Sequence, residues 1–272
     1  MEPGPAFKGF VFACWMAGLT VLAAADDASP GNPADNLPGI ALIIDDLGNQ
    51  KGYGRQAIQL PGPVACSFLP HGPFTRSLAK LAHKQNKEVM LHLPMEAIHG
   101  THPDREQGEL TLDMTQRQFQ EVLAGDIAAV PYVTGLNNHM GSLLTRHPGH
   151  MAWLMKSLSR RGSLFFVDSR TTRETIARQL AVEYGIPATD RNVFLDNEPE
   201  PEAVREQFRK LVEMARHKGT ALGIGHPHPG TLQVLREELA GLDEQGIRLL
   251  PVAGLIDLQN REDRVWRVSS SR

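Results

Sequence analysis

Short apolar runs alternate with longer segments of helical periodicity from residue 39 onward. The runs are rich in Val, Ile and Leu, which is typical of strands buried on both faces of a parallel sheet. Strands are predicted at Ile40–Ile44, Val64–Leu69, Glu88–Leu93, Val133–Leu136, Leu164–Val167, Val193–Leu195, Ala221–Ile224 and Ile247–Leu250. Helices are predicted between them, at Lys51–Gln59, Phe74–Gln85, Thr115–Ala129, Pro148–Arg161, Arg173–Tyr184, Glu202–Lys218 and Gly230–Glu244.

This alternation predicts an α/β fold, because helical crossovers join parallel strands. For one domain of this length, the expected closed form is a distorted (β/α) barrel of 7–8 parallel strands. An open doubly wound sheet is the alternative. Neither a Gly-x-Gly-x-x-Gly nor a Gly-x-x-x-x-Gly-Lys motif follows a strand, which disfavours a nucleotide-binding version of that alternative.

The two ends of the chain differ from this pattern. Residues 1–25 have the order of a secretory signal peptide: Lys8, an apolar run from Gly9, and small residues up to Ala25. Residues 26–37 are rich in Asp, Pro and Gly and predict a flexible linker. The barrel is expected over 38–258, and 259–272 is expected to be a polar tail. We therefore expect a periplasmic or secreted bacterial protein, with no stable membrane span after cleavage.

Composition narrows the class of partner. The formal net charge of −3 gives no basis for expecting nucleic acid as a partner. Cys66, the only cysteine after cleavage, lies in an apolar run and is expected to be a small buried residue. The 11 histidines are unusual for this length, and their positions along the chain lead to the candidate site.

Asp and His recur where predicted strands end, and in parallel α/β folds ligands bind at that edge. The residues that follow successive strands include Asp45, Asp46, His71, His92, Glu96, Asn138, His139, Asp168, Asp196, His226 and His228. Some of them have structural explanations. Asp168 and Asp196 precede helices and are possible N-caps, and His71 fits an ordinary loop residue. Two adjacent carboxylates exceed what a helix cap needs, so Asp45 and Asp46 require a compensating partner.

One carboxylate and two imidazoles form the donor set of a catalytic zinc-type site, which leaves an open position for water. The metal lowers the pKa of that water, a neighbouring carboxylate can act as general base, and a histidine can act as general acid. No Gly-x-Ser-x-Gly motif is present, so serine catalysis is disfavoured.

The segment Ile43-Ile44-Asp45-Asp46-Leu47-Gly48 resembles the Thr-Phe-Asp-Asp-Gly motif of NodB-type polysaccharide deacetylases, carbohydrate esterase family 4. With His92–Glu96, Asn137–Ser142, Phe166–Ser169 and Gly225–Pro229, the chain is more similar to the divergent polysaccharide deacetylase family. The resemblance covers roughly 38–258. It implies a distorted barrel and a metal-dependent reaction that removes acetyl groups from sugars.

The resemblance also implies roles for individual residues. The first Asp of the family motif is the base and the second is a metal ligand, which correspond to Asp45 and Asp46. The family's His-x-x-x-His ligand pair is matched here by His92-x-x-x-Glu96, so His139 or Glu96 is the candidate for the third ligand. The late family histidine, the general acid, is matched by His226 or His228, either of which is alternatively a further ligand.

The sequence therefore predicts a metal-dependent hydrolase that acts on an envelope polysaccharide or oligosaccharide and removes N- or O-acetyl groups. The predicted ligands of a divalent metal, taken to be Zn²⁺, are Asp46, His92 and His139. Asp45 and His226 or His228 are the predicted catalytic residues, and substrate contacts are assigned to Glu96, Asn138 and Asp168. The alternative is a non-catalytic periplasmic module that binds a glycan or a protein and keeps the pocket.

Overall fold

The structure is a computed structural model that describes residues 1, 4, 37–98 and 106–270. Nearly all of the predicted signal peptide and of the predicted linker lies outside the described residues. The folded unit begins at Leu37. Within the described part of the chain, no helix is long and apolar enough to cross a membrane.

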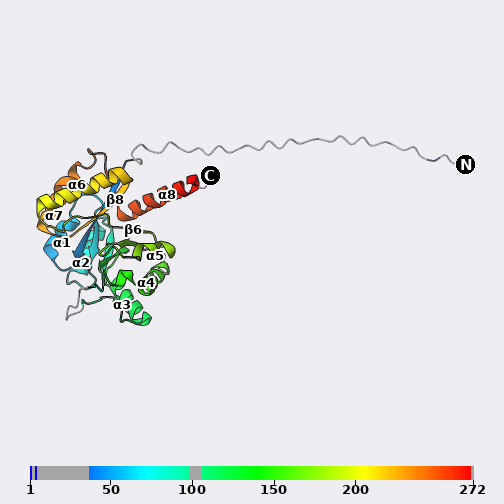
Figure 1. Ribbon diagram of the computed structural model, residues 1–272, viewed down its shortest axis with the longest axis horizontal. Helices are drawn as coiled ribbons and strands as arrows, with labels where there is room; N and C mark the ends of the chain where they lie inside the picture. The colour runs from blue at the N-terminus through cyan, green and yellow to red at the C-terminus, as the bar shows by residue number, and fades with distance from the viewer. Residues whose placement is uncertain (2–3, 5–36, 99–105, 271–272) are drawn as a thin grey trace. The chain divides into compact units, whose positions relative to one another are not determined.

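The core of the unit is one curled sheet whose strand pairs are all parallel in the described residues (Figure 1). Its strands are β1 (Gly39–Leu47), β2 (Ala65–Phe68), β3 (Val89–Met95), β4 (Val133–Met140), β5 (Phe165–Asp168), β6 (Ala188–Asp190), β7 (Val193–Phe194), β8 (Thr220–Gly225) and β9 (Arg248–Leu249). Their order is β6-β5-β4-β3-β2-β1-β8-β7, and β9 pairs with β1. The predicted distorted barrel is confirmed.

Helices follow the strands and cover the outside of the sheet (Figure 1). They are α1 (Lys51–Ile58), α2 (Thr75–Lys84), α3 (Gln116–Ala129), α4 (Pro148–Ser159), α5 (Ala177–Glu183), α6 (Pro201–Lys218), α7 (Pro229–Glu238) and α8 (Val252–Ser270). Hydrogen bonds at the start of α3 explain why a helix could be predicted from Thr115 onward. Thr115 accepts a hydrogen bond from the Gln118 backbone, and the Gln118 side chain accepts one from the Thr115 backbone, which is a capping box.

A split strand joins the two edges of the curled sheet. Strand β6 pairs with β5, and β7 pairs with β8, while only Arg191 and Asn192 separate β6 from β7. The backbone of Arg191 donates to Asp168 on one side, and that of Asn192 donates to Leu222 on the other. One extended segment therefore contacts both edges, and the barrel closes through a distorted seam. The first half of this segment, β6, was not predicted.

Alternation along the strands separates two apolar layers. Ile43, Met90 and Val167 point into the barrel, whereas neighbours such as Ile44 pack outward under the helices. The first turns of α8 close the end of the barrel where the strands begin, with Leu255 and Ile256 in the inner cluster. Glu88 accepts hydrogen bonds from the first backbone amides of α8, those of Val252 and Ala253. The opposite end, where the strands finish, is not covered by this helix and is available for a functional site.

The last helix extends beyond the predicted domain end at residue 258. The backbone of α8 is helical to Ser270, across most of the segment expected to be a polar tail. The domain boundary at 258 remains a prediction.

Candidate metal centre

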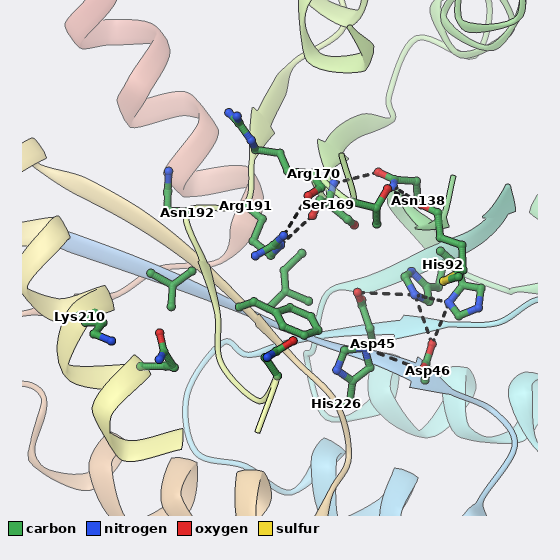
Figure 2. A pocket seen from close by; sticks show the side chains of 18 of the residues that line it. Asp45, Asp46, His92, Asn138, Ser169, Arg170, Arg191, Asn192, Lys210 and His226 are labelled. Atoms are coloured by element: carbon green, nitrogen blue, oxygen red, sulfur yellow. Dashed lines mark hydrogen bonds and ion pairs between the residues drawn. The ribbon is translucent and has the colours of Figure 1, made fainter. Parts of the chain in front are cut away.

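The predicted residues from β1, β3, β4 and the end of β8 line one cavity of about 790 Å³ at the carboxyl edge of the sheet (Figure 2). Asp45 and Asp46 come from β1, His92 from β3 and His139 from β4, and His226 follows β8. Parallel strands end at one edge, so residues far apart in sequence meet there.

A β-bulge turns both acidic side chains of β1 toward the cavity. In a regular strand, adjacent side chains point to opposite faces. Between Ile44 and Leu47, however, β1 holds one more residue than the facing stretch of β2 between Cys66 and Phe68. Asp46 has a φ of 55°, a left-handed conformation that Asp tolerates better than most residues. The bulge re-aims Asp46, as bulges beside functional sites often do.

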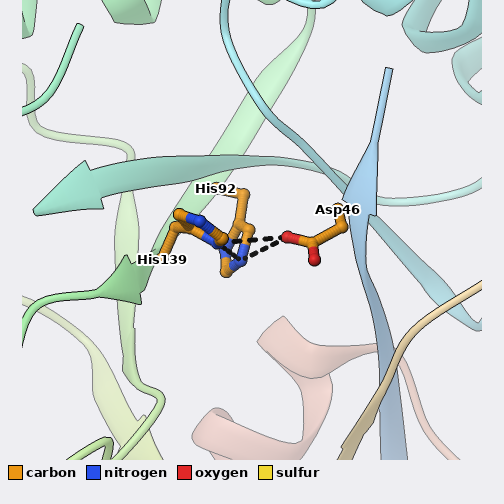
Figure 3. A group of neighbouring side chains, drawn as sticks. All are labelled: Asp46, His92 and His139. Atoms are coloured by element: carbon orange, nitrogen blue, oxygen red, sulfur yellow. Dashed lines mark hydrogen bonds and ion pairs between the residues drawn. The ribbon is translucent and has the colours of Figure 1, made fainter. Parts of the chain in front are cut away.

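Three side-chain atoms form a small triangle beside β1 (Figure 3). His92 Nε2 lies 3.3 Å from Asp46 Oδ1, His139 Nδ1 lies 3.1 Å from the same oxygen, and the two nitrogens are 3.0 Å apart. Ligand atoms about 2.1 Å from one cation stand about 3.0 Å apart at right angles and about 3.4 Å apart at tetrahedral angles. The triangle has the size of one face of a metal coordination shell.

The hydrogen bonding of Asp46 points to the same conclusion. Its Oδ1 is buried and makes no hydrogen bond of acceptable angle within the described residues, although both imidazoles are near. This is expected when the three atoms face a common point instead of one another. A carboxylate oxygen and two imidazole nitrogens are donors that suit zinc and similar divalent cations. The described residues therefore fit a divalent metal.

The charges of the residues at the triangle also favour a bound cation. Burial raises the pKa of Asp46, but the contacts from His139 and His92 outweigh it and hold that pKa well below its usual range. Burial lowers the pKa of His92, but Asp45 and Asp46 outweigh it and raise that pKa. Asp46 is thus ionised and attracts positive charge, and a metal cation would replace the proton on His92.

Asn137 determines which nitrogen of His92 faces the triangle. A carboxylate only accepts hydrogen bonds, so the Asn137 amide nitrogen is the atom that faces Asp45, at 2.9 and 3.0 Å from its two oxygens. The Asn137 oxygen then accepts from Ser67 Oγ at 2.6 Å and faces His92 Nδ1 at 3.2 Å. His92 therefore carries its hydrogen on Nδ1, and Nε2 presents a lone pair to the metal position.

Replacing Asn137 with leucine is expected to weaken zinc binding by about 10- to 100-fold, because His92 loses the partner that fixes its tautomer. Competition with a chromophoric chelator measures this affinity. Ser169→Ala is the matched control, because the one hydrogen bond of Ser169 Oγ within the described residues is to the Asn137 amide nitrogen, at 3.1 Å. Equal zinc affinities for Asn137→Leu and the wild type would contradict this role.

His226 is fixed at the site by a buried carboxylate that follows β7. Asp196 accepts from His226 Nδ1 at 3.0 Å and from the His226 backbone at 2.6 Å, and Thr231 Oγ1 donates to it at 2.7 Å. His226 Nε2 then lies 3.8 Å from Asp46 Oδ2. Burial lowers the pKa of His226, but Asp196, Asp45 and Asp46 outweigh it and raise the pKa to about 9.

Three other predicted residues lie outside this cavity. His228 is exposed at the start of α7, so His226 is the late histidine that faces Asp46. The carboxylate of Glu96 accepts from the Leu112 backbone at 2.7 Å and holds the segment that leads to α3. Asp168 accepts from the Arg170 backbone and from Thr175, which stabilises the turn after β5.

Asn138 does line the cavity, and its amide also holds the site together. Its Nδ2 donates to the Met140 carbonyl at 2.7 Å, and its Oδ1 accepts from the Ser169 backbone at 2.8 Å. Both the nitrogen and the oxygen of the Asn138 side-chain amide are thereby hydrogen-bonded within the protein.

Several residues at the site were given no role in it from the sequence. They are Asn137, Arg191, Phe194 and Glu106, together with Asp196, which was named among the strand-end residues as a possible N-cap. Asp196 was expected to cap a helix, but α6 begins after Glu200 and has no side-chain cap. Glu106 Oε2 lies 3.4 Å from His139 Nε2 and orients the outer side of that ring. The signal that could have identified Asn137 is the pair of adjacent asparagines, Asn137 and Asn138, at the end of β4.

Comparison with known proteins identifies related sequences. The model of the family described as divergent polysaccharide deacetylase matches residues 42–256. The uncharacterized protein YibQ of Escherichia coli is 33% identical over 218 residues, which are 80% of this chain and 67% of that protein. An uncharacterized protein of Haemophilus influenzae is 33% identical over 216 residues, 79% of this chain and 76% of that protein.

Solved structures share the fold at lower sequence identity. An uncharacterized protein of Agrobacterium tumefaciens superposes with a TM-score of 0.78 at 19% identity, covering 81% of this chain and 89% of that one. A mutant, with restored activity, of a pseudoenzyme of carbohydrate esterase family 4 from Bacillus anthracis has a TM-score of 0.52 at 17% identity, with 82% and 69% covered. The peptidoglycan deacetylase PdaC of Bacillus subtilis has a TM-score of 0.51 at 14% identity, with 86% and 98% covered.

Proposed function

This chain belongs to the divergent polysaccharide deacetylase family, and on that premise we propose that it is a metal-dependent hydrolase that removes N- or O-acetyl groups from a cell-envelope polysaccharide. One observation carries the proposal. An ionisable base and a protonated acid, Asp45 and His226, both lie at the ligand triangle: Asp45 Oδ2 is 3.6 Å from His92 Nε2, and His226 Nε2 is 3.8 Å from Asp46 Oδ2.

Asp46, His92 and His139 would hold the cation, which supplies Lewis-acid polarisation of the acetyl carbonyl and lowers the pKa of water. Asp45 takes the proton from the attacking water. Burial raises the pKa of Asp45, against the opposing effects of His92 and His226, which makes the carboxylate a stronger base. Two hydrogen bonds from Asn137 hold it in place.

His226 delivers the proton that the leaving group needs. Its raised pKa keeps it protonated near neutral pH, and Asp196 fixes the ring so that Nε2 faces the site. As the bond between the acetyl carbon and the sugar nitrogen or oxygen breaks, that atom takes the His226 proton. The products are acetate and the free amine or hydroxyl, and Asp45 and His226 regain their starting states by exchange with water.

The shape of the site supports a polymeric substrate. A second cavity, of about 380 Å³, adjoins the first, and Asp46, His139 and His226 line both. A glycan that crosses the ligand triangle has room to extend into both cavities. This arrangement supports the removal of acetyl groups from successive sugars of a polysaccharide. We expect the reaction to take place in the predicted periplasmic or secreted location.

Release of acetate from N-acetylated chitooligosaccharides and peptidoglycan fragments tests the proposal. We expect release by zinc-loaded protein, loss of release with a chelator, and about a 10²- to 10⁴-fold lower kcat for Asp45→Asn, since it removes the base. Glu183→Gln, at an exposed position on α5, is the control. No release from either substrate by metal-loaded wild type would favour the alternative, a non-catalytic module that binds a glycan or protein.

A further inference from the structure

The wall of the large cavity away from the ligand triangle carries positive charge. Arg170, Arg191 and Lys210 line it, although the whole chain has a formal net charge of −3 (Figure 2). Arg170 follows β5, Arg191 lies in the seam between β6 and β7, and Lys210 belongs to α6. We call these three residues the basic wall.

Arg191 differs from the other two residues of the basic wall in having no acidic partner. Arg170 Nη1 lies 2.7 Å from Asp190 Oδ2, and Lys210 Nζ lies 2.7 Å from Glu206 Oε1. No carboxylate of the described chain lies within ion-pair distance of Arg191. Burial lowers the pKa of the half-buried Arg191, and the attraction of the more distant Asp45 and Asp168 does not offset this effect.

The protein fixes one edge of the Arg191 guanidinium, and another edge has no hydrogen-bond partner among the residues that the structure describes. Nε donates to the Ser169 carbonyl at 2.7 Å, and Nη2 donates to the Arg170 carbonyl at 3.0 Å. The Arg191 Cζ atom lies 4.9 Å from the centre of the Phe194 ring, which supports the guanidinium from one face. Of five N–H donors, three remain, on Nη1 and Nη2, and this end of the fork matches a carboxylate.

Charge balance makes the cavity attractive to anions once the triangle is filled. A divalent cation offsets the charges of Asp45 and Asp46, which are the only acidic residues lining the cavity among those the structure describes. Arg170 and Lys210 each have a carboxylate partner, and so does His226. Arg191 then supplies the uncompensated positive charge of the cavity lining. A concave site lined by one sign of charge raises the local concentration of the opposite ion.

We propose that Arg191, with the rest of the basic wall, binds a carboxylate on a sugar unit next to the acetylated one, so that the substrate is an acidic acetylated polysaccharide. This inference rests on the proposed function, because it places the acetyl group at the ligand triangle. The cavity of about 790 Å³ is within the range that encloses a ligand of disaccharide size.

A matched pair of oligosaccharides tests the inference on the full chain. The acidic probe is a hexasaccharide of alternating glucuronic acid and N-acetylglucosamine, and the neutral probe is the same compound with its carboxylates reduced to alcohols. Calorimetry measures Kd for both on zinc-loaded Asp45→Asn protein, whose turnover is expected to be about 10²- to 10⁴-fold slower. We expect the acidic probe to bind about 10- to 100-fold more tightly, with a preference that falls as salt is added.

Variants of the basic residues identify the side chain responsible. Arg191→Gln is expected to abolish the preference, and Arg191→Lys to retain part of it, because a lysine keeps the charge but loses the fork. Arg209→Gln, an exposed neighbour of Lys210 on α6, is the matched control and is expected to retain all of it. A muramic acid disaccharide measured alongside shows whether a lactyl carboxylate or a uronic acid binds more tightly.

The outcomes separate this inference from the proposed function. Equal Kd values for the acidic and neutral probes would overturn the inference, and this comparison needs no variant of the basic wall. So would a preference that survives in folded Arg191→Gln protein. Equal acetate release from both probes by the wild type would also overturn it while supporting the hydrolase. Tight acidic binding without acetate release would support it and contradict the hydrolase.

Discussion

Replacing Asp46 with alanine is expected to abolish stoichiometric zinc binding, because this carboxylate supplies one of the three atoms of the ligand triangle. Removing a residue that only orients a ligand typically weakens metal binding by about 10- to 100-fold, so loss of a ligand is expected to cost more than about 100-fold. His92→Ala is expected to behave in the same way. Elemental analysis of purified, dialysed protein measures the metal content of each variant.

His228→Ala is the matched control for these two variants. His228 belongs to the same histidine-rich segment as His226, but its side chain is exposed and lies outside the large cavity. We expect it to keep one zinc ion per chain. If Asp46→Ala and His92→Ala both retain stoichiometric metal, the assigned metal centre is wrong, whatever the control shows.

The second large effect concerns the stability of the metal-free protein at alkaline pH. The pKa of His226 is raised to about 9 in the folded protein, against about 6.5 in an unfolded chain. A raised histidine pKa contributes stability that is fully present below pH ~6.5 and is lost as pH rises through ~9. The shift corresponds to about 3 kcal/mol of unfolding free energy.

Urea denaturation of the wild type and His226→Gln at about pH 6 and about pH 10, with a chelator present, measures this contribution. The difference between the two proteins isolates His226 from other groups that titrate over the same range. We expect the wild-type advantage at the lower pH to shrink by about 3 kcal/mol at the higher pH. A difference independent of pH would contradict the raised pKa, whereas Asp196→Asn is expected to reduce the pH dependence.

Most of the barrel was predictable from sequence because its strands are buried on both faces. Such strands appear as continuous apolar runs, and each run that was identified forms a strand. The strand β6 was missed because Ala188-Thr189-Asp190 is short and partly polar, and its pairing with β5 is set by tertiary contacts. Similarly, the extra residue in β1 cannot be recognised without its neighbour β2.

The candidate ligands were predictable for a topological reason, since strand ends converge at one edge. His139 was the predicted third ligand, but nothing in the sequence distinguishes it from Glu96, because the choice depends on register. In the pairing of β3 with β4, Pro94 lies opposite His139, which brings His139 beside His92, whereas Glu96 points to the Leu112 backbone. Asp168 also follows a predicted strand, as the candidate ligands do, but its carboxylate stabilises a turn.

Residues that act through other residues were the hardest to identify. Asn137 bonds to Asp45 across 92 positions of sequence, and Asp196 bonds to His226 across 30. Their amide and carboxylate groups are common in loops and helix caps, so residue type alone carries no signal. Their roles become clear only from the hydrogen bonds that their partners, Asp45 and His226, make in the structure.

The split between β6 and β7 makes one short segment responsible for two properties. Arg191 and Asn192 connect the two halves of the closing strand, and both also line the cavity. The proposed metal ligands come from β1, β3 and β4 and do not belong to this segment. Under the proposed function, we therefore expect substitutions at the seam to change which glycan binds while the residues proposed for the reaction stay the same.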